Sequence, residues 1–147
     1  MVQDDLLLRF PAGLAGFPEE RELRLYEPKD GYPLKFLQSV NNPELSFVCM
    51  DAAAIKVDYE VPLSDGEAAL LDLQDPRDAL VLTLVVVPED PRQMTANLAG
   101  PLVVNTRTLT GCQVALDSRQ YPLQYPVFAS KEDVEITFPA GLVGFPA

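Results

Sequence analysis

Residues 79–87 read ALVLTLVVV, and this run says most about the fold of the chain. It contains nine residues, is rich in valine and lies between Asp78 and Pro88. A short apolar run with such boundaries is typical of a central strand that is buried on both faces. The run therefore predicts a sheet whose two sides are both covered.

Shorter runs on either side of this strand predict a series of further strands. Apolar residues alternate or cluster in the ranges 6–10, 21–27, 45–49, 57–61, 102–105, 113–117 and 124–128. Ser64 followed by Glu67 forms a capping-box pattern and predicts a helix to about Leu73, and Pro91 predicts a second helical turn. Fourteen prolines and eight glycines punctuate these elements. The predicted fold is mainly β, an antiparallel barrel-like structure with one or two short helices.

One peptide occurs at both ends of the chain. Residues 9–18 read RFPAGLAGFP, and residues 137–146 read TFPAGLVGFP. Each copy predicts a strand that ends at proline, followed by a turn in which the glycines adopt positive φ. We expect a domain over residues 1–129, followed by a linker and partial repeat over 130–147. Either residues 134–138 take the place of strand 6–10 in the same or a neighbouring molecule, or the segment begins a truncated tandem copy and dangles.

Composition and charge limit the kind of partner and compartment. The 147 residues carry a formal net charge of −11, and no cluster of lysine and arginine is present, which disfavours direct nucleic-acid binding. No uncharged apolar run approaches the roughly 20 residues of a membrane-spanning helix. Asp4 and Asp5 stand where a secretory signal needs positive charge, so we expect a cytoplasmic protein. Cys49 and Cys112 lie among apolar residues and predict two buried, reduced thiols.

The sequence offers little for catalysis. It contains no histidine, which excludes Ser-His-Asp, Cys-His and histidine-metal sites. A carboxylate pair, Asp51 with Asp58 or Glu89 with Asp90, stays open as an acid and base, although carboxylates at strand ends are usually solvated turn residues. The glycines of 10–17 lack the spacing of a phosphate-binding loop, so no cofactor is expected.

Several segments together carry a family resemblance. They are FPAGLAGF at 10–17, LKFLQS at 34–39, LSFVCMD at 45–51, TANLAGPLVVN at 95–105 and GCQVAL at 111–116. In this order and spacing the chain resembles the flagellar assembly factor FliW over residues 6–128. The resemblance implies a non-enzymatic, barrel-like protein that binds flagellin and, in turn, the RNA-binding translational repressor CsrA. The second FPAGLVGF departs from the family pattern.

On this resemblance, twelve residues are candidates for partner contact, and each has a structural alternative. Phe10, Leu14 and Phe17 form either a corner that recognises a partner or only a connection between strands. Phe36, Leu37 and Gln38 either present an exposed apolar edge to a partner or occupy positions in the core. Turn closure is the alternative for Asn97 and Asn105. The four acidic candidates are either exposed negative groups near a partner or charges that only aid solubility. They are Asp51, Asp58, Glu89 and Asp90.

Overall fold

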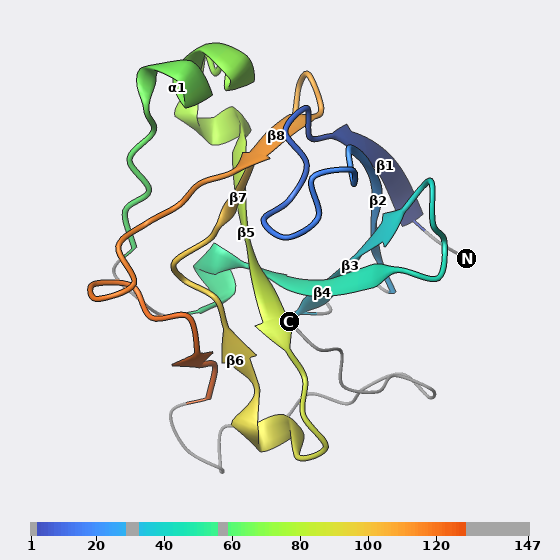
Figure 1. The fold of residues 1–147 in the computed structure, drawn as a ribbon, viewed down its shortest axis with the longest axis vertical. Coiled ribbons are helices and arrows are strands. Elements are labelled where there is room, and N and C mark those ends of the chain that lie inside the picture. Colours follow the sequence, from blue (N-terminus) through green and yellow to red (C-terminus); the bar gives the residue numbers. More distant parts are fainter. Residues whose placement is uncertain (1–2, 29–32, 56–58, 129–147) are drawn as a thin grey trace.

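A computed structural model describes residues 3–28, 33–55 and 59–128, and this part of the chain is mainly β, as predicted (Figure 1). The strands are β1 (Gln3–Arg9), β2 (Glu22–Glu27), β3 (Leu34–Ser39), β4 (Ser46–Asp51), β5 (Ala79–Val86), β6 (Thr95–Ala96), β7 (Leu102–Asn105), β8 (Thr110–Gln113) and β9 (Tyr125–Pro126). The helices are α1 (Asp65–Leu71) and the 3-10 turns η1 (Ala52–Ala54), η2 (Pro76–Asp78) and η3 (Pro91–Gln93). The predicted helix and the predicted second helical turn therefore correspond to α1 and η3.

Seven of the strands form a closed barrel. They follow one another in the order β4-β3-β2-β1-β8-β7-β5, and a further pairing of β4 with β5 closes the ring. The described pairings are antiparallel except that of β1 with β8, which is parallel and joins Arg9 to Thr110. β6 pairs with the end of β5, and β9 pairs with β6. Closure gives each barrel strand two neighbours and so leaves it no free edge.

Strand β5 is central to this arrangement, as its valine-rich sequence predicts. It pairs with β4 on one side and with β7 and β6 on the other. Its inward residues Leu80, Leu82 and Leu84 contribute to the barrel interior, while Val81 and Val85 contribute to clusters on the outside. Both faces of β5 are thus covered by apolar side chains.

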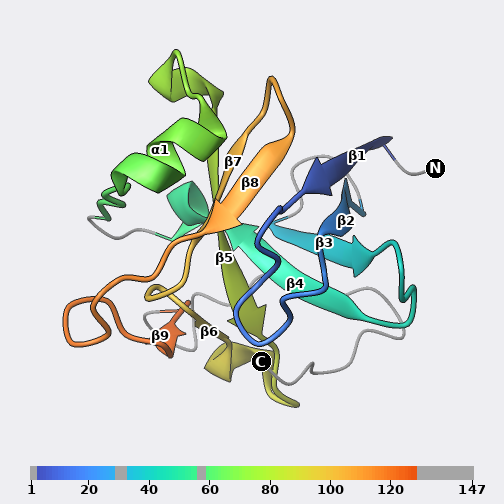
Figure 2. The same ribbon diagram turned by 45° about the horizontal axis from the view of Figure 1, so that its top comes forward.

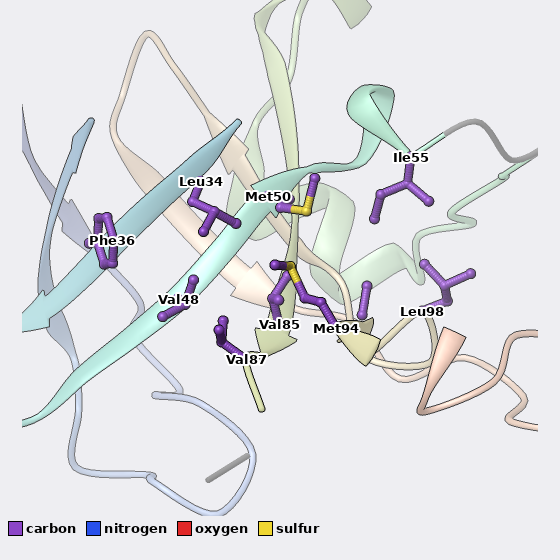
Figure 3. Close-up of a cluster of buried hydrophobic side chains, with 10 residues drawn as sticks. Leu34, Phe36, Val48, Met50, Ile55, Val85, Val87, Met94 and Leu98 are labelled. Carbon is purple, nitrogen blue, oxygen red and sulfur yellow. The ribbon is translucent and has the colours of Figure 1, made fainter. Parts of the chain in front are cut away.

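The apolar core consists of three clusters separated by the barrel wall. The interior cluster is Leu8, Phe10, Leu14, Leu23, Leu25, Leu37, Cys49, Leu82, Leu102 and Val104. A second cluster covers the outer face of β3, β4 and β5, and Figure 3 shows its side chains converging from those strands and from the segment around Met94. The third lies between α1 and the β7–β8 hairpin and contains Leu71, Val103, Cys112 and Val114. Helix α1 therefore covers one side of the barrel, as Figure 2 shows.

The structure corrects the predicted strands at several places. Residues 34–39 were not predicted as a strand and form β3. The strand predicted at 113–117 lies earlier, at 110–113, because Thr110 to Gln113 pair in register with β7. The strand predicted at 124–128 is shortened to two residues. Residues 59–61 are not in a strand, and the rest of the range predicted at 57–61 lies outside the described residues.

Candidate partner-binding site

The corner after β1 has the backbone that its glycines predict. Gly13 has φ of 70° and Gly16 has φ of 80°. An antiparallel bridge joins Leu14, which lies between the two glycines, to Phe17, which follows Gly16. Amide hydrogen bonds link these two residues in both directions, at 3.0 and 2.8 Å. Leu14 is buried in the barrel interior, whereas Phe17 is 38% exposed. The tight corner thus separates one anchoring side chain from one that faces outward. The matching glycines of the second copy lie outside the described residues.

Two contacts fix the corner to the barrel. The amide of Ala15 donates to Oε1 of Gln113 at 2.7 Å, and Nε2 of Gln113 donates to the carbonyl of Gly100 at 2.9 Å. The ring of Phe17 meets the ring of Phe47 edge to face, with centroids 5.2 Å apart. This geometry is a favourable aromatic contact. The corner is therefore held to β8 by a side-chain amide and to β4 by an aromatic pair.

A pocket of about 280 Å³ opens between this corner and the β4–β5 part of the wall. Figure 2 shows the loop after β1 lying against that part of the barrel. The pocket is lined by Leu14, Ala15, Phe17, Ser46, Phe47, Val48, Leu84, Val85, Val86, Asn97, Gln113, Leu123 and Gln124. Two of the lining side chains are large, apolar and well exposed, Phe17 and Leu123, the latter at 59%.

The chemistry of the pocket suits binding. Every lining side chain is apolar or carries a neutral amide or hydroxyl, and none is a carboxylate, thiol, amine or guanidinium. Such a lining can take up apolar side chains, and the side-chain amide of Gln124 can pair with the backbone of a bound segment. The amide of Gln113 and Oδ1 of Asn97 are engaged within the protein. It holds no acid, base or strong nucleophile with which to perform catalysis.

The side chains with strongly displaced pKa values do not line the pocket. Burial raises the pKa of Cys49 to about 12 and the pKa of Cys112 to about 11. Burial also raises the pKa of Tyr59 well above its usual range, and its hydroxyl donates to the carbonyl of Leu98 at 2.6 Å. All three shifts favour the uncharged form of a packed side chain. The described residues contain no cluster of three or more metal-ligating side chains.

The pocket brings together three of the twelve predicted residues: Leu14, Phe17 and Asn97. Asn97 also closes a turn, because its Oδ1 accepts from the amides of Ala99 at 2.9 Å and Gly100 at 3.1 Å. Those two bonds fix the shape of the loop before β7. The other predicted residues do not line it.

The remaining predicted apolar residues are part of the core. Phe10 and Leu37 are fully buried in the interior, and Phe36 is 8% exposed and stacks on Tyr26 with ring centroids 5.5 Å apart. The amide nitrogen of Gln38 donates to the carbonyl of Pro43 at 2.8 Å. Their burial favours the core role and offers a partner no large apolar edge at 36–38.

Asn105 is buried and has an architectural bonding pattern. Its Nδ2 donates to the carbonyl of Leu71 at 2.8 Å, and its Oδ1 accepts from the amide of Arg107 at 2.8 Å. These bonds join the end of α1 to the β7–β8 turn. Asn105 therefore has no exposed surface with which to contact a partner.

The predicted acidic residues differ in their surroundings. Asp51 caps η1 and lies 3.8 Å from Lys35, and Asp90 caps η3 and lies 2.9 Å from Arg92. Glu89 is exposed and forms no ion pair with a described residue. Asp58, and with it the carboxylate pair Asp51–Asp58, lies outside the described residues. The Glu89–Asp90 pair has one of its members engaged by an arginine.

Reading the sequence missed most of the pocket. Phe47, Leu84, Gln113 and Leu123 lie on four separate segments and share no motif. One weak signal exists, since Leu123 is a large apolar residue beside Pro122 in a stretch that is otherwise polar and turn-rich. The other residues look like ordinary strand residues until the barrel closes.

Comparisons with known proteins bear on this fold and pocket. The family model described as FliW protein matches residues 1–127. The chain belongs to the FliW family. Its relatives include the flagellar assembly factor FliW of Natranaerobius thermophilus, 37% identical over 128 residues and covering 86% of this chain and 85% of that one. The flagellar assembly factor FliW of Geobacter sulfurreducens is 34% identical over 127 residues, covering 86% and 79%.

A crystal structure of the flagellar assembly factor FliW has the same fold. It superposes with a TM-score of 0.78 at 31% sequence identity, covering 85% of this chain and 87% of that chain. The FliW-like barrel predicted from the sequence is thereby confirmed. None of the helices in the described ranges is long and apolar enough to cross a membrane.

Proposed function

We propose that this FliW-family chain is a non-enzymatic, cytoplasmic regulator of flagellar assembly that binds flagellin and antagonises a CsrA-type translational repressor. Flagellin that accumulates before export occupies the protein and leaves the repressor free. Once flagellin is secreted, the protein binds the repressor and relieves repression of flagellin synthesis. The names of the relatives, flagellar assembly factors, support the setting in which this switch operates.

The observation that carries the binding role is the uncharged pocket beside Phe17. It offers apolar surface and neutral amides, which suits an apolar stretch of a protein chain better than a small charged substrate. Phe17 and Leu123 stand at its mouth, where aromatic and large apolar side chains often contribute most to binding. We assign flagellin to this pocket.

Calorimetric titration with the flagellin of the same organism tests this assignment. Phe17→Ala removes a ring that a bound segment would cover. Complete burial of such a side chain contributes about 1.5–3 kcal/mol, and only the exposed 38% of Phe17 is left for a partner to bury, so we expect affinity to fall by roughly three- to sevenfold. Leu123→Asp places a charge at the mouth and should weaken binding further. Leu70→Ala is the matched control, because Leu70 is also 38% exposed but lies on α1.

The outcomes separate the assignment from the function. An equal loss of flagellin affinity in Phe17→Ala and Leu70→Ala would show that flagellin binds elsewhere on the molecule. No binding of flagellin by the parent protein would contradict the proposed function. Binding of flagellin without binding of the repressor would leave a flagellin chaperone. Absence of binding to both flagellin and the repressor would favour the alternative functions, a carboxylate-dependent enzyme or a ligand-binding barrel.

Binding of the repressor is supported by charge. With a net charge of −11, the protein would be attracted to a basic RNA-binding surface and would repel RNA phosphates near it. We expect the affinity for CsrA to fall as ionic strength rises, because salt screens attractions between exposed charges. Affinity that is equal at low and high salt would contradict an electrostatic mechanism.

A further inference from the structure

The second copy of the N-terminal peptide matches the first in a way that follows burial. Residues 6–18 read LLLRFPAGLAGFP, and residues 134–146 read VEITFPAGLVGFP. The second copy gains one charge relative to the first, because Glu135 stands in place of Leu7. Leu7 is 40% exposed in the first copy. The fully buried Leu8 is matched by Ile136. The differences at Arg9 and Ala15 also fall on exposed positions of the first copy.

The place of residues 6–18 in the barrel, here called the β1 slot, makes strict demands at two residues. Gly13 has positive φ, and a Cβ there would lie 2.5 Å from the carbonyl oxygen of Pro18. Phe10 is fully buried, and its ring lies so close to Gly111 that a Cβ on that glycine would be 2.9 Å away. The second copy has glycine and phenylalanine at both equivalent positions, 141 and 138. It therefore meets the two requirements that most other sequences would fail.

The polar contacts of the β1 slot depend on the backbone of its occupant. The amide of Phe10 donates to the carbonyl of Arg21 at 2.8 Å, and the amide of Arg9 donates to the carbonyl of Leu109 at 2.9 Å. The amide of Ala15 donates to Gln113. Thr137 and Val143 can supply the same amides as Arg9 and Ala15, because neither contact uses the occupant's side chain.

We propose that residues 134–146 are a second occupant of the β1 slot and can replace residues 6–18 between β2 and β8. Each chain has two sequences for one slot, and strand exchange follows when the resident copy leaves. The occupant comes from the same molecule or from a second copy of the chain. Leu14, Ala15 and Phe17 of the resident copy also line the pocket, but the exchange can be tested without flagellin and without the repressor.

Three full-length variants test the exchange by urea denaturation followed by circular dichroism. Leu8→Asp places a carboxylate at a fully buried position of the first copy, and the second copy should rescue the fold, so a cooperative transition is retained. Ile136→Asp alone should leave the midpoint unchanged. The double variant has no intact occupant and should lose the transition. Loss of the transition in Leu8→Asp as complete as in the double variant would overturn the proposal.

A cross-link provides the second readout. Arg9 pairs with Glu22 across β1 and β2, so Arg9→Cys with Glu22→Cys shows whether a disulfide forms in this register. In the Leu8→Asp background, Thr137→Cys with Glu22→Cys should give the equivalent disulfide, and Lys131→Cys with Glu22→Cys should not. Peptide mapping detects the bond, and Cys49 and Cys112 are buried. Formation at 137 supports exchange, within one molecule if the mass is monomeric and between two if it is dimeric. Absence of the 137–22 disulfide, when the Arg9 control forms its disulfide, overturns the proposal even if the double variant loses its unfolding transition.

Discussion

Gly13 and Gly16 lie three residues apart in the corner after β1, and their surroundings differ. Both have positive φ, which costs a residue with a Cβ roughly 1 kcal/mol or more. At Gly13 a Cβ would also meet the backbone of Pro18 at 2.5 Å, whereas at Gly16 nothing lies within 4 Å. The corner therefore needs glycine at 13 for space as well as for conformation.

Substitution of the two glycines separates these requirements. We expect Gly16→Ala to lower the free energy of unfolding by about 1 kcal/mol, the conformational cost alone. Gly13→Ala should lower it by at least about 1 kcal/mol more, because the backbone of Pro18 must move. Urea denaturation of both variants measures the difference. Equal losses would show that the corner relaxes freely around position 13.

Helix α1 has seven residues, too few to be stable alone, and its supports come from outside its own backbone. Ser64 and Glu67 form a complete capping box at its start, with bonds of 3.1 and 2.8 Å. Asn105 bonds the carbonyl of Leu71 at its end, and Leu71 is fully buried against the β7–β8 hairpin. The element is therefore stabilised by a cap at each end and one anchor.

The start of α1 allows two opposite substitutions. Ser64→Ala removes the cap and should lower the free energy of unfolding by about 0.5–2 kcal/mol. Gly66→Ala should raise it by about 0.5–1 kcal/mol, because alanine is the better helix former and a Cβ would have only the Ser64 hydroxyl near it, at 4.0 Å. Thermal or urea unfolding of the two variants checks the signs. A Gly66→Ala variant less stable than the parent would mean that α1 needs a non-helical conformation there.

The barrel as a whole keeps both thiols out of water in different clusters. Cys49 lies in the interior and Cys112 lies between α1 and the hairpin. Burial is the main cause that raises the pKa of each thiol from its ordinary value of 9.0, to about 12 for Cys49 and about 11 for Cys112. The folded molecule therefore prefers the neutral thiol more strongly than the unfolded chain does.

This preference predicts a loss of stability in alkaline solution. Below about pH 9 both states hold the thiol protons and the contribution is complete. For Cys49 the unfolded chain ionises first between about pH 9 and 12, so the free energy of unfolding should fall by roughly 1.4 kcal/mol per pH unit. For Cys112 the fall has the same sign but ends near pH 11. Because tyrosines also titrate in this range, the measurement compares the parent with Cys49→Ala. A parent and variant with the same pH slope from 9 to 11 would contradict the assigned burial of that thiol.

Local patterns were sufficient wherever one element reports its own environment. The valine-rich run at 79–87 indicates a central strand, the capping box indicates α1, and the paired glycines indicate a corner with positive φ, all of which the structure contains. The apolar surroundings of Cys49 and Cys112 indicate two buried thiols, which are free and buried. These features depend on side chains within a few residues of one another along the chain.

β3 shows where this reasoning fails. Leu34 and Phe36 face the outer cluster, whereas Leu37 faces the interior, so both faces of the strand are apolar and the alternation that marks a one-sided strand is lost. The pocket could not be predicted from the sequence either, because its lining residues come from separate segments between residues 14 and 124. No sequence window contains more than a part of it.

The periodicity, caps and turns of the elements can be predicted from the amino-acid sequence, because they depend on neighbours along the chain. Three features follow only from the folded barrel: β1 lies beside β8, β4 pairs with β5 to close the ring, and Phe17 contacts Phe47 in a pocket that Leu123 also lines. Those neighbours are chosen by the packing of the whole barrel, where each strand must bury its apolar faces against strands that are remote in sequence. The binding pocket belongs to this second class, because it exists only where the corner after β1 is held against the closed wall.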